Sequence, residues 1–506
     1  MYESRQLSQT NELITVSSYP ERIRIEEPLD MIANSGLLTV SADGIDKVSM
    51  SYLGFQESPN KRSDLIRPLV VVRQGGPSSP STLYNAHIFS GTHSAHFDID
   101  GQLQMLRPNP FLLEVADVVN FDAPMTGAGT NLDPKDPTWA FGVEQDGKIF
   151  AAAVACYCSM FYPDRMPPII WAVSSYGAVG ANVSILKMAE QGIDTKGLAI
   201  ISGLYDKRLN SYDYAQTHDP EPYIHAIGAM AVANWYHRRS ESYWKRQLTP
   251  DEVYNEANTI AVTSYAEAVT SSNSGRREAA ANQLADIIGL TPKLIQDEDL
   301  MIDPGLFRRS LLPQRILSGV ESRLTFSVPR SVRIDPALDI WEPQLINEIT
   351  RTGRARGYGE AIVAACQRWQ FQGILDLHSW PYTGLWAEGN LYKGMERLHQ
   401  VLPDLRVMDI RGYYDLNNPT DSNIFWRQFC EQVDYQPYSS SGDTEDTMTG
   451  IDGYRIGMGH QANKSVELTL TLRKLAVQVV RDANRSDWPD NRLPVREVQR
   501  PVFSYR

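Results

Sequence analysis

Short apolar runs typical of buried strands alternate with helical periodicity along much of the chain. The strand-like runs lie at 68–73, 116–121, 168–173, 198–202 and 405–410. Apolar residues recur with helical spacing at about 146–161, 185–191 and 465–482. This alternation predicts an α/β fold, in which a mostly parallel sheet carries helices on both faces. The beginning of the chain differs, since 36–55 predicts two strands around Asp43-Gly44, and Asp100-Gly101 marks a second hairpin.

Between about 206 and 385 the strand pattern fades and helix signals replace it. Thr249-Pro250-Asp251-Glu252 offers an N-cap, a proline in the first turn and an acid placed to close a capping box, and Thr291-Pro292 repeats the first two features. Helices are predicted at 224–236, 253–269 and 276–288. We therefore predict a helical cap at 206–385, inserted into a core made of residues 1–205 and 386–506. The polar stretch 439–452 is predicted to be a loop.

Length and composition agree with one large core that carries an insertion. A single core seldom grows beyond roughly 250–300 residues, and this chain has 506. Apolar residues make up 42% and charged residues 22%, which excludes a mostly disordered chain. The net charge of −13 would repel nucleic acid and anionic membranes. Because no apolar run resembles a signal peptide or reaches membrane length, we expect a cytoplasmic protein with neither a nucleic-acid nor a membrane partner.

Four cysteines, Cys156, Cys158, Cys366 and Cys430, are too few and too scattered for a disulfide framework. We expect them to be reduced and mostly buried. One residue separates Cys156 from Cys158, which is not the spacing of the usual redox dithiol motif. A redox role therefore has little support from the sequence.

The stretch 169–177 has the pattern of a nucleophile elbow, in which a buried strand turns sharply into a helix and exposes one serine. Five apolar residues lead into Ser174, Ser175, Tyr176 and Gly177. Ser175 is the candidate nucleophile because Gly177 follows it by two residues, whereas Ser174 has no glycine two residues away on either side. The alternative interpretation is a serine that caps a helix after a strand.

Three further segments could complete such a site. Gln74-Gly75-Gly76-Pro77 follows the strand at 68–73 and offers bare backbone N–H groups that could stabilise an oxyanion. Asp415 lies in the loop after the strand at 405–410, and His460 comes just before the final helix. The order Ser, Asp, His along the chain is that of the α/β-hydrolases.

Taken together, these segments resemble the serine carboxypeptidase family, particularly its bacterial members, over about residues 36–482. Five segments, found in the order of that family, carry the resemblance: Gln74-Gly75-Gly76-Pro77, Asp117 to Pro124 with Thr126 to Gly129, Ser174-Ser175-Tyr176-Gly177, Gly412 to Leu416, and Gly459-His460. The resemblance implies an α/β-hydrolase fold with Ser175 as nucleophile, His460 as base and acid, and Asp415 as the residue that orients the histidine. It also implies an oxyanion hole formed by the backbone N–H groups of Gly76 and Tyr176.

The sequence departs from this family where its carboxypeptidases bind the terminal carboxylate of a peptide. At these substrate-binding positions Gln74 stands in place of an asparagine and Ser174 in place of a glutamic acid. A serine cannot supply the protonated carboxyl that donates a hydrogen bond to the substrate, so we expect weak carboxypeptidase action and no preference for acid pH. Val173 stands where the elbow usually has glycine, and its branched side chain is expected to crowd the following helix.

Other polar residues have simpler interpretations. His87, His93 and His96 lack a carboxylate or cysteine at convincing ligand spacing, so we predict no metal site. Asp409 is a second candidate for the acid, but its place within a strand favours a structural role. Three aromatic residues and a histidine either line a pocket beneath the cap or belong to the core: His378, Trp380, Tyr382 and Trp386.

The sequence therefore predicts a serine-dependent acyl-transfer enzyme, most simply a hydrolase of an ester or amide that works without a cofactor. Its expected partner is a small-molecule or peptide-like substrate, and self-association to a homo-oligomer stays open. Two alternatives remain. One is an acyltransferase that passes the acyl group to an alcohol or amine, and the other is a binding protein or lyase that uses the same pocket.

Overall fold

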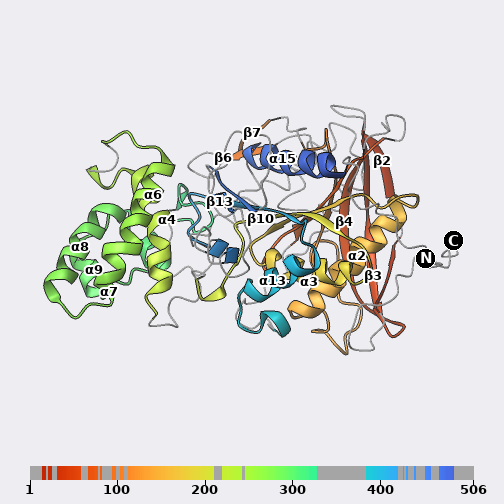
Figure 1. Cartoon of the computed structure of the whole chain (residues 1–506), viewed down its shortest axis with the longest axis horizontal. Helices are drawn as coiled ribbons and strands as arrows, with labels where there is room; N and C mark the ends of the chain where they lie inside the picture. The colour runs from red at the N-terminus through yellow and green to blue at the C-terminus, as the bar shows by residue number, and fades with distance from the viewer. Residues whose placement is uncertain are drawn as a thin grey trace.

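The structure is a computed structural model, and its central feature is an 11-stranded sheet (Figure 1). The residues that it describes are 14–18, 21–25, 31–58, 66–77, 80–81, 94–97, 103–107, 112–209, 219–241, 245–326, 383–419, 425–426, 429–430, 438–439, 451–456 and 466–483.

The strands of this sheet are β1 (Ile14–Ser18), β2 (Glu21–Ile25), β3 (Met31–Ala42), β4 (Ile45–Glu57), β5 (Leu69–Arg73), β8 (Asp117–Phe121), β9 (Ile169–Ser174), β10 (Thr195–Ile201), β13 (Arg406–Gly412), β14 (Tyr438–Ser439) and β15 (Ile451–Ile456). They lie in the order β1-β3-β4-β8-β5-β9-β10-β13-β15-β14, and β2 pairs with β3. Neighbours are antiparallel up to β4 and β8, and parallel from β8 onward. The eight strands from β3 to β15 have the order and directions of the α/β-hydrolase fold, as predicted.

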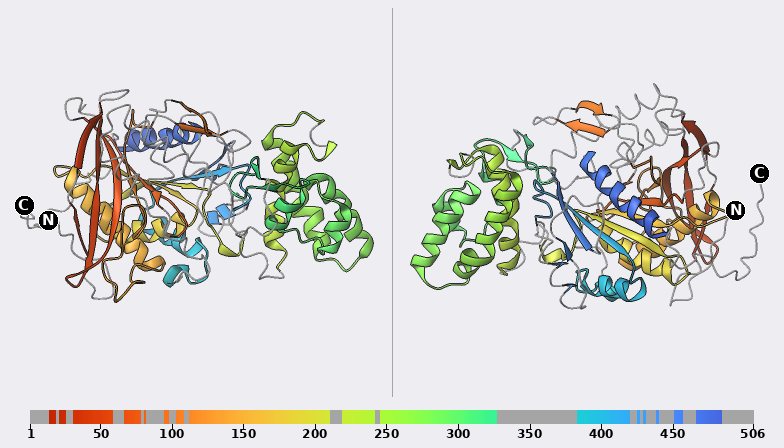
Figure 2. Two further views of the ribbon diagram at one scale, coloured as in Figure 1. Left: turned by 180° about the vertical axis from the view of Figure 1, so that it is seen from behind. Right: turned by 45° about the horizontal axis from the view of Figure 1, so that its top comes forward.

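Helices cover both faces of the sheet, in agreement with the alternation in the sequence (Figures 1 and 2). One face carries α2 (Val143–Phe161), α3 (Gly177–Ala189) and α13 (Tyr392–Val401), and the other carries α15 (Val466–Ala483). The central strand β9 divides its side chains between the two cores. Ile169, Trp171 and Val173 pack with α2 and α3, whereas Ile170 and Ala172 pack with α15. A strand buried on both faces in this way is necessarily apolar at nearly every position.

The beginning of the chain forms the antiparallel side of the sheet. The predicted hairpin is confirmed, because β3 and β4 pair along their length and the turn between them has positive φ at Asp43 (49°) and Gly44 (79°). The second predicted hairpin agrees with an antiparallel pair of β6 (Ser94–Phe97) and β7 (Leu103–Arg107), although its turn lies outside the described residues. The edge strands β1 and β2 were not expected from the sequence.

Residues 221–241 and 245–326, here called the helical unit, form a bundle beside the sheet (Figure 1). Its elements are α4 (Glu221–His237), α6 (Pro250–Ile260), the π-helix η4 (Ala261–Tyr265), α7 (Ala266–Val269), α8 (Ser274–Ile288), α9 (Pro292–Asp297), α10 (Pro304–Ser310), β11 (Ile316–Leu317) and β12 (Thr325–Phe326). The predicted capping box is present at Thr249 and Glu252, and Thr291 caps α9. The division at 206–385 remains a proposal. Within the described part of the chain, no helix is both long and apolar enough to cross a membrane.

The prediction of a loop over 439–452 is wrong at both ends of this range. Ser439 belongs to β14, and Ile451 and Asp452 begin β15, while residues 440–450 lie outside the described residues. The serine, glycine, aspartate and threonine residues of this stretch, among them Asp452, led to the prediction of a loop. The pairing of β15 with β13 over the full length of the strand supplies backbone hydrogen bonds that do not depend on side-chain type.

Three of the cysteines, Cys156, Cys158 and Cys430, are buried free thiols, as expected, and Cys366 lies outside the described residues. Burial raises the pKa of Cys156 to about 12 and that of Cys430 to about 11. Thiolate, the reactive form, is therefore scarce at neutral pH, and these residues act as small apolar side chains.

Candidate active site

Ser175 occupies a sharp turn between the end of β9 and the start of α3. Its φ is +53°, in the left-handed region that residues other than glycine seldom adopt. Hydrogen bonds on both sides hold this conformation: its N–H donates to Ile201 O (3.0 Å), and its carbonyl accepts from Ala178 (3.1 Å) and Leu204 (3.1 Å). A strained, half-buried serine at the carboxyl end of a central strand has the geometry of a nucleophile elbow.

The loop after β5 packs closely against this elbow. A Cβ on Gly75 would lie 2.6 Å from both Ser174 O and Ser175 Cβ, and 2.9 Å from Tyr176 N. Gly76, the next residue, has φ +111°, a conformation that favours glycine. Only backbone without side chains can approach so closely, so the loop packs directly against the serine.

A methyl group at Gly75 should therefore damage the site. We expect Gly75→Ala to lower kcat by about 10²-fold, because the loop or the elbow must shift by a large part of an ångström. Gly275→Ala is the matched control, since the nearest atom to a Cβ there is Asn273 Oδ1 at 3.4 Å and the site is remote. Steady-state kinetics of both variants tests this, and a wild-type kcat in Gly75→Ala would contradict the close approach.

A buried ionic network lies behind the elbow. The carboxylate of Asp146, in α2, accepts a hydrogen bond from the Tyr176 hydroxyl (2.9 Å) and pairs with Arg73 Nη2 at the end of β5. All three side chains are nearly inaccessible to solvent. Burial raises the pKa of Asp146, and the Arg73 guanidinium and the Tyr176 hydroxyl oppose this shift. The resemblance in sequence did not point to Arg73 or Asp146. A charged residue ending the apolar strand 69–73 is the signal that could have done so.

Asp415 lies in the loop that follows β13. The side chain is buried, and its Oδ1 accepts from the N–H groups of Asn417 (2.8 Å) and Asn418 (2.9 Å). The Asn418 side chain in turn donates to Ser202 O (2.9 Å), at the end of β10 next to β9. Ser202 is a second strained residue, with φ +46°. Asn418 therefore anchors the loop of Asp415 to the strand end beside Ser175.

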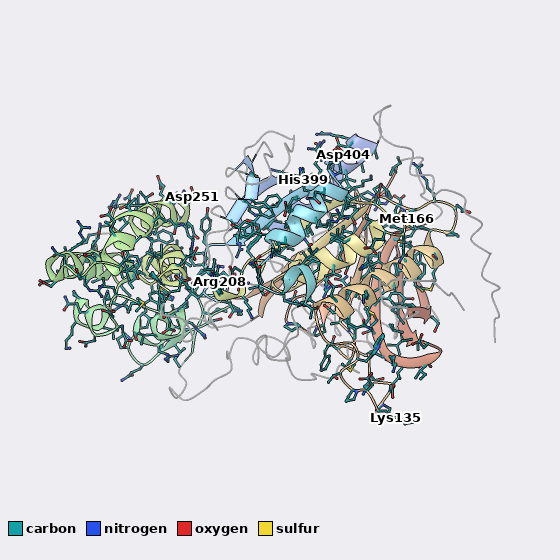
Figure 3. All side chains as sticks on the ribbon, turned by 60° about the horizontal axis from the view of Figure 1, so that its bottom comes forward. Lys135, Met166, Arg208, Asp251, His399 and Asp404 are labelled. Carbon is teal, nitrogen blue, oxygen red and sulfur yellow. The ribbon has the colours of Figure 1, made fainter. Side chains whose placement is uncertain are left out.

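The helical unit also contacts this loop through hydrogen bonds and apolar packing. The loop comprises residues 413–418 and is here called the acid loop. Leu416 N–H donates to Gly319 O (2.9 Å), and the carbonyl of Tyr414 accepts from Ser322 N–H (2.9 Å). The Tyr414 and Leu416 side chains, 4% and 1% exposed, belong to the apolar core of the helical unit. Contacts also include the Tyr413 hydroxyl, which donates to Asp251 (2.9 Å) at the edge of the unit that faces the sheet (Figure 3).

Asp409, the other candidate acid, has different hydrogen-bond and ionic partners from those of Asp415. It accepts a hydrogen bond from the Tyr205 hydroxyl and lies 3.8 Å from Arg411 Nε. It lies in β13 two residues after Val407, which packs in the core on the α2 and α3 side, so it faces the same side of the sheet. The buried hydrogen bond between Tyr205 and Asp409 joins β13 to the segment that follows β10, and this contact favours a structural role for Asp409.

His460 lies outside the described residues, and so do His378, Trp380 and Tyr382. β15 ends at Ile456, which pairs with Gly412 at the end of β13. The four residues from there to His460 span at most about 14 Å when extended. The topology thus brings Ser175 and Asp415 to one edge of the sheet, and the strand that precedes His460 ends at that edge. Trp386, from the same aromatic group, is buried in the core.

Comparisons with known proteins find structural likeness at low identity. No protein-family model matches the sequence, and no curated protein matches it. Kex1, a prohormone-processing carboxypeptidase from Saccharomyces cerevisiae, is 14% identical with a TM-score of 0.43, over 93% of this chain and 91% of that chain. Juvenile hormone epoxide hydrolase from the silkworm Bombyx mori is 9% identical with a TM-score of 0.35, over 89% and 80%. The peroxisomal α/β-hydrolase Lpx1 from Saccharomyces cerevisiae is 11% identical with a TM-score of 0.32, over 94% and 91%.

These likenesses are weak, and the fold is assigned from the strand order. The α/β-hydrolase order places β9 before the nucleophile position, β13 before the acid and β15 before the histidine. Ser175, Asp415 and His460 each follow the corresponding strand in the sequence.

The two expected substrate-binding residues lie beside the elbow. Ser174 ends β9 and is buried. The Gln74 N–H donates to Ser81 Oγ (2.8 Å), and its side-chain oxygen is buried with no hydrogen-bond partner among the described residues. Val173 is fully buried in the core beneath α3.

The prediction that the three histidines bind no metal can be compared with the structure only in part. His87 and His93 lie outside the described residues, and His96 lies in β6. Among the side chains that are described, no group of three or more His, Cys, Asp or Glu could hold a metal ion.

Proposed function

We propose that this protein is a serine hydrolase that cleaves an ester or amide through an acyl-enzyme. The observation that carries the proposal is the left-handed Ser175 at the end of β9, with the glycine loop after β5 packed against it. A serine that only capped a helix would need neither the strained conformation nor the close approach of Gly75.

In this mechanism Ser175 Oγ attacks the substrate carbonyl while His460 takes the hydroxyl proton. Asp415 orients the imidazole and stabilises its charged form. The N–H groups of Gly76 and Tyr176 bind the developing oxyanion. His460 then gives its proton to the leaving group, and water attacks the acyl-enzyme to release the acid.

A fluorophosphonate probe tests the proposal directly, because it phosphonylates only an activated serine. We expect covalent labelling of the folded protein, with the label on the peptide that contains Ser175. Labelling at another serine, or none at all, would contradict the proposal. Product analysis with and without added alcohols or amines then separates a hydrolase from an acyltransferase.

The pH dependence should follow one group, the base. An imidazole has a reference pKa of about 6.5 and acts as a base only when neutral, so kcat/KM should rise from about pH 6 to a plateau above pH 7. Because Ser174 replaces the acidic residue of the carboxypeptidases, we also expect little release of C-terminal amino acids from unblocked peptides. Assays of blocked dipeptides, their esters and their amides from pH 4 to 9 check both points. Efficient carboxypeptidase action with a maximum near pH 5 would contradict them.

A further inference from the structure

The buried network behind the elbow connects the two segments that would supply the oxyanion-hole donors. Arg73 is the last residue of β5 and stands directly before the loop that contains Gly76. Tyr176 directly follows Ser175. Asp146, from α2, uses the same carboxylate oxygen, Oδ2, to bind both the guanidinium of Arg73 and the hydroxyl of Tyr176. One oxygen atom therefore joins the two segments, in addition to the backbone pairing of β5 with β9.

The surroundings of Arg73 restrict it to this arrangement. Its guanidinium carbon lies 3.9 Å from the centroid of the Phe150 ring, and a Cβ at Gly180 of α3 would overlap the guanidinium. Phe150 and Gly180, which has no side chain, thus both lie against the planar group and leave it little room to move. Arg73 is 2% exposed, Asp146 3% and Tyr176 1%, so water does not compete for these contacts.

Stability alone is a poor explanation for the network. Nε and Nη1 of Arg73 are buried without hydrogen-bond partners among the described residues, and desolvating them costs free energy. A buried ion pair of this kind often contributes less to stability than apolar residues of the same size. What the charged pair provides is orientation, because a carboxylate oxygen and a guanidinium fix direction as well as distance.

We propose that Arg73, Asp146 and Tyr176 form a positioning network that holds the N–H groups of Gly76 and Tyr176 at the spacing an oxyanion requires. The inference rests on the proposed function, since it assigns a task within the same active site. None of the three side chains contacts the substrate. Their effect passes through the backbone, and it should be larger on the transition state than on substrate binding.

Tyr176→Phe is the most conservative test, because it removes only the hydroxyl that Asp146 binds. With p-nitrophenyl acetate as substrate, we expect kcat to fall by about 10- to 100-fold with KM nearly unchanged, less than the roughly 10²–10³-fold loss on removing an oxyanion donor outright. The inhibition constant of phenylboronic acid, whose serine adduct places a hydroxyl in the oxyanion hole, should rise by a similar factor. Tyr265→Phe is the matched control, since its buried hydroxyl donates to Leu300 O (2.7 Å) inside the helical unit. It should lose a similar amount of thermal stability and keep its kcat.

Asp146→Asn provides a second test through the same oxygen. Adding Tyr176→Phe to Asp146→Asn should cost little more than Asp146→Asn alone, because both changes break one connection. If Asp146→Asn does not fold, Tyr176→Phe still decides. A kcat and boronate affinity within twofold of wild type in Tyr176→Phe would overturn the inference, and so would an activity loss that only tracks the unfolded fraction. If the wild-type protein fails to label at Ser175 with the fluorophosphonate, the proposed function itself fails, and the inference fails with it.

Discussion

Ser175→Ala is expected to lower kcat by about 10⁴–10⁶-fold, which corresponds to roughly 5–8 kcal/mol of lost transition-state stabilisation. The hydroxyl is the proposed nucleophile, and its loss leaves a volume too small to disturb a half-buried turn. The melting temperature should therefore stay close to that of the wild type. Steady-state assays with p-nitrophenyl acetate, together with fluorophosphonate labelling, measure the effect.

Ser159→Ala is the control for this change. Ser159 lies in α2, is half-buried, and donates its hydroxyl to Ala155 O (2.9 Å), remote from the elbow. It should label and turn over like the wild type. A Ser175→Ala protein that keeps more than a tenth of wild-type activity would show that another residue carries the reaction.

Asp415→Asn should be the second most harmful change, with a loss in kcat of about 10³–10⁴-fold and little change in stability. The asparagine oxygen can still accept the N–H groups of Asn417 and Asn418, so the acid loop keeps its turn. The negative charge that orients and stabilises a protonated imidazole is lost, and the wrong tautomer of the base is favoured.

Asp409→Asn is the matched change at the other candidate acid and should give the opposite result. It leaves the buried Arg411 without a charged partner in β13 and should destabilise the fold by about 3–5 kcal/mol. The folded enzyme should retain its kcat at low temperature. Comparison of kcat and melting temperature in the two variants decides the assignment, and a larger kcat loss in Asp409→Asn would exchange the two roles.

Local signals predicted much of the fold because their physical basis is local. The capping box at Thr249 and the turn at Asp43-Gly44 depend on residues within a few positions of one another, and both are present. The sequence predicts one helix over 253–269, whereas the structure inserts the π-helical turn Ala261–Tyr265. The extra residue in that turn leaves the apolar spacing on either side almost unchanged, so the pattern could not reveal it.

Contacts between distant segments explain what the sequence could not predict. The partners Arg73 and Asp146 are separated by 73 positions, and only the packing of α2 behind β5 brings them together. β15 became a strand through its pairing with β13, despite the polar residues within it. The proposed nucleophile was recognisable from the sequence because the strand, the turn and the glycine of an elbow are consecutive.

The contacts between the helical unit and the acid loop couple the unfolding of the helical unit to the loss of the acid loop's structure. Tyr414 and Leu416 are core residues of the helical unit, so the unit cannot melt without releasing the loop between them, which holds Asp415. The unit therefore differs from a detachable lid over a finished active site. Melting of the helical unit should therefore inactivate the proposed enzyme even while the sheet remains intact, and mutations that stabilise the unit should slow that loss without any contact with the active site.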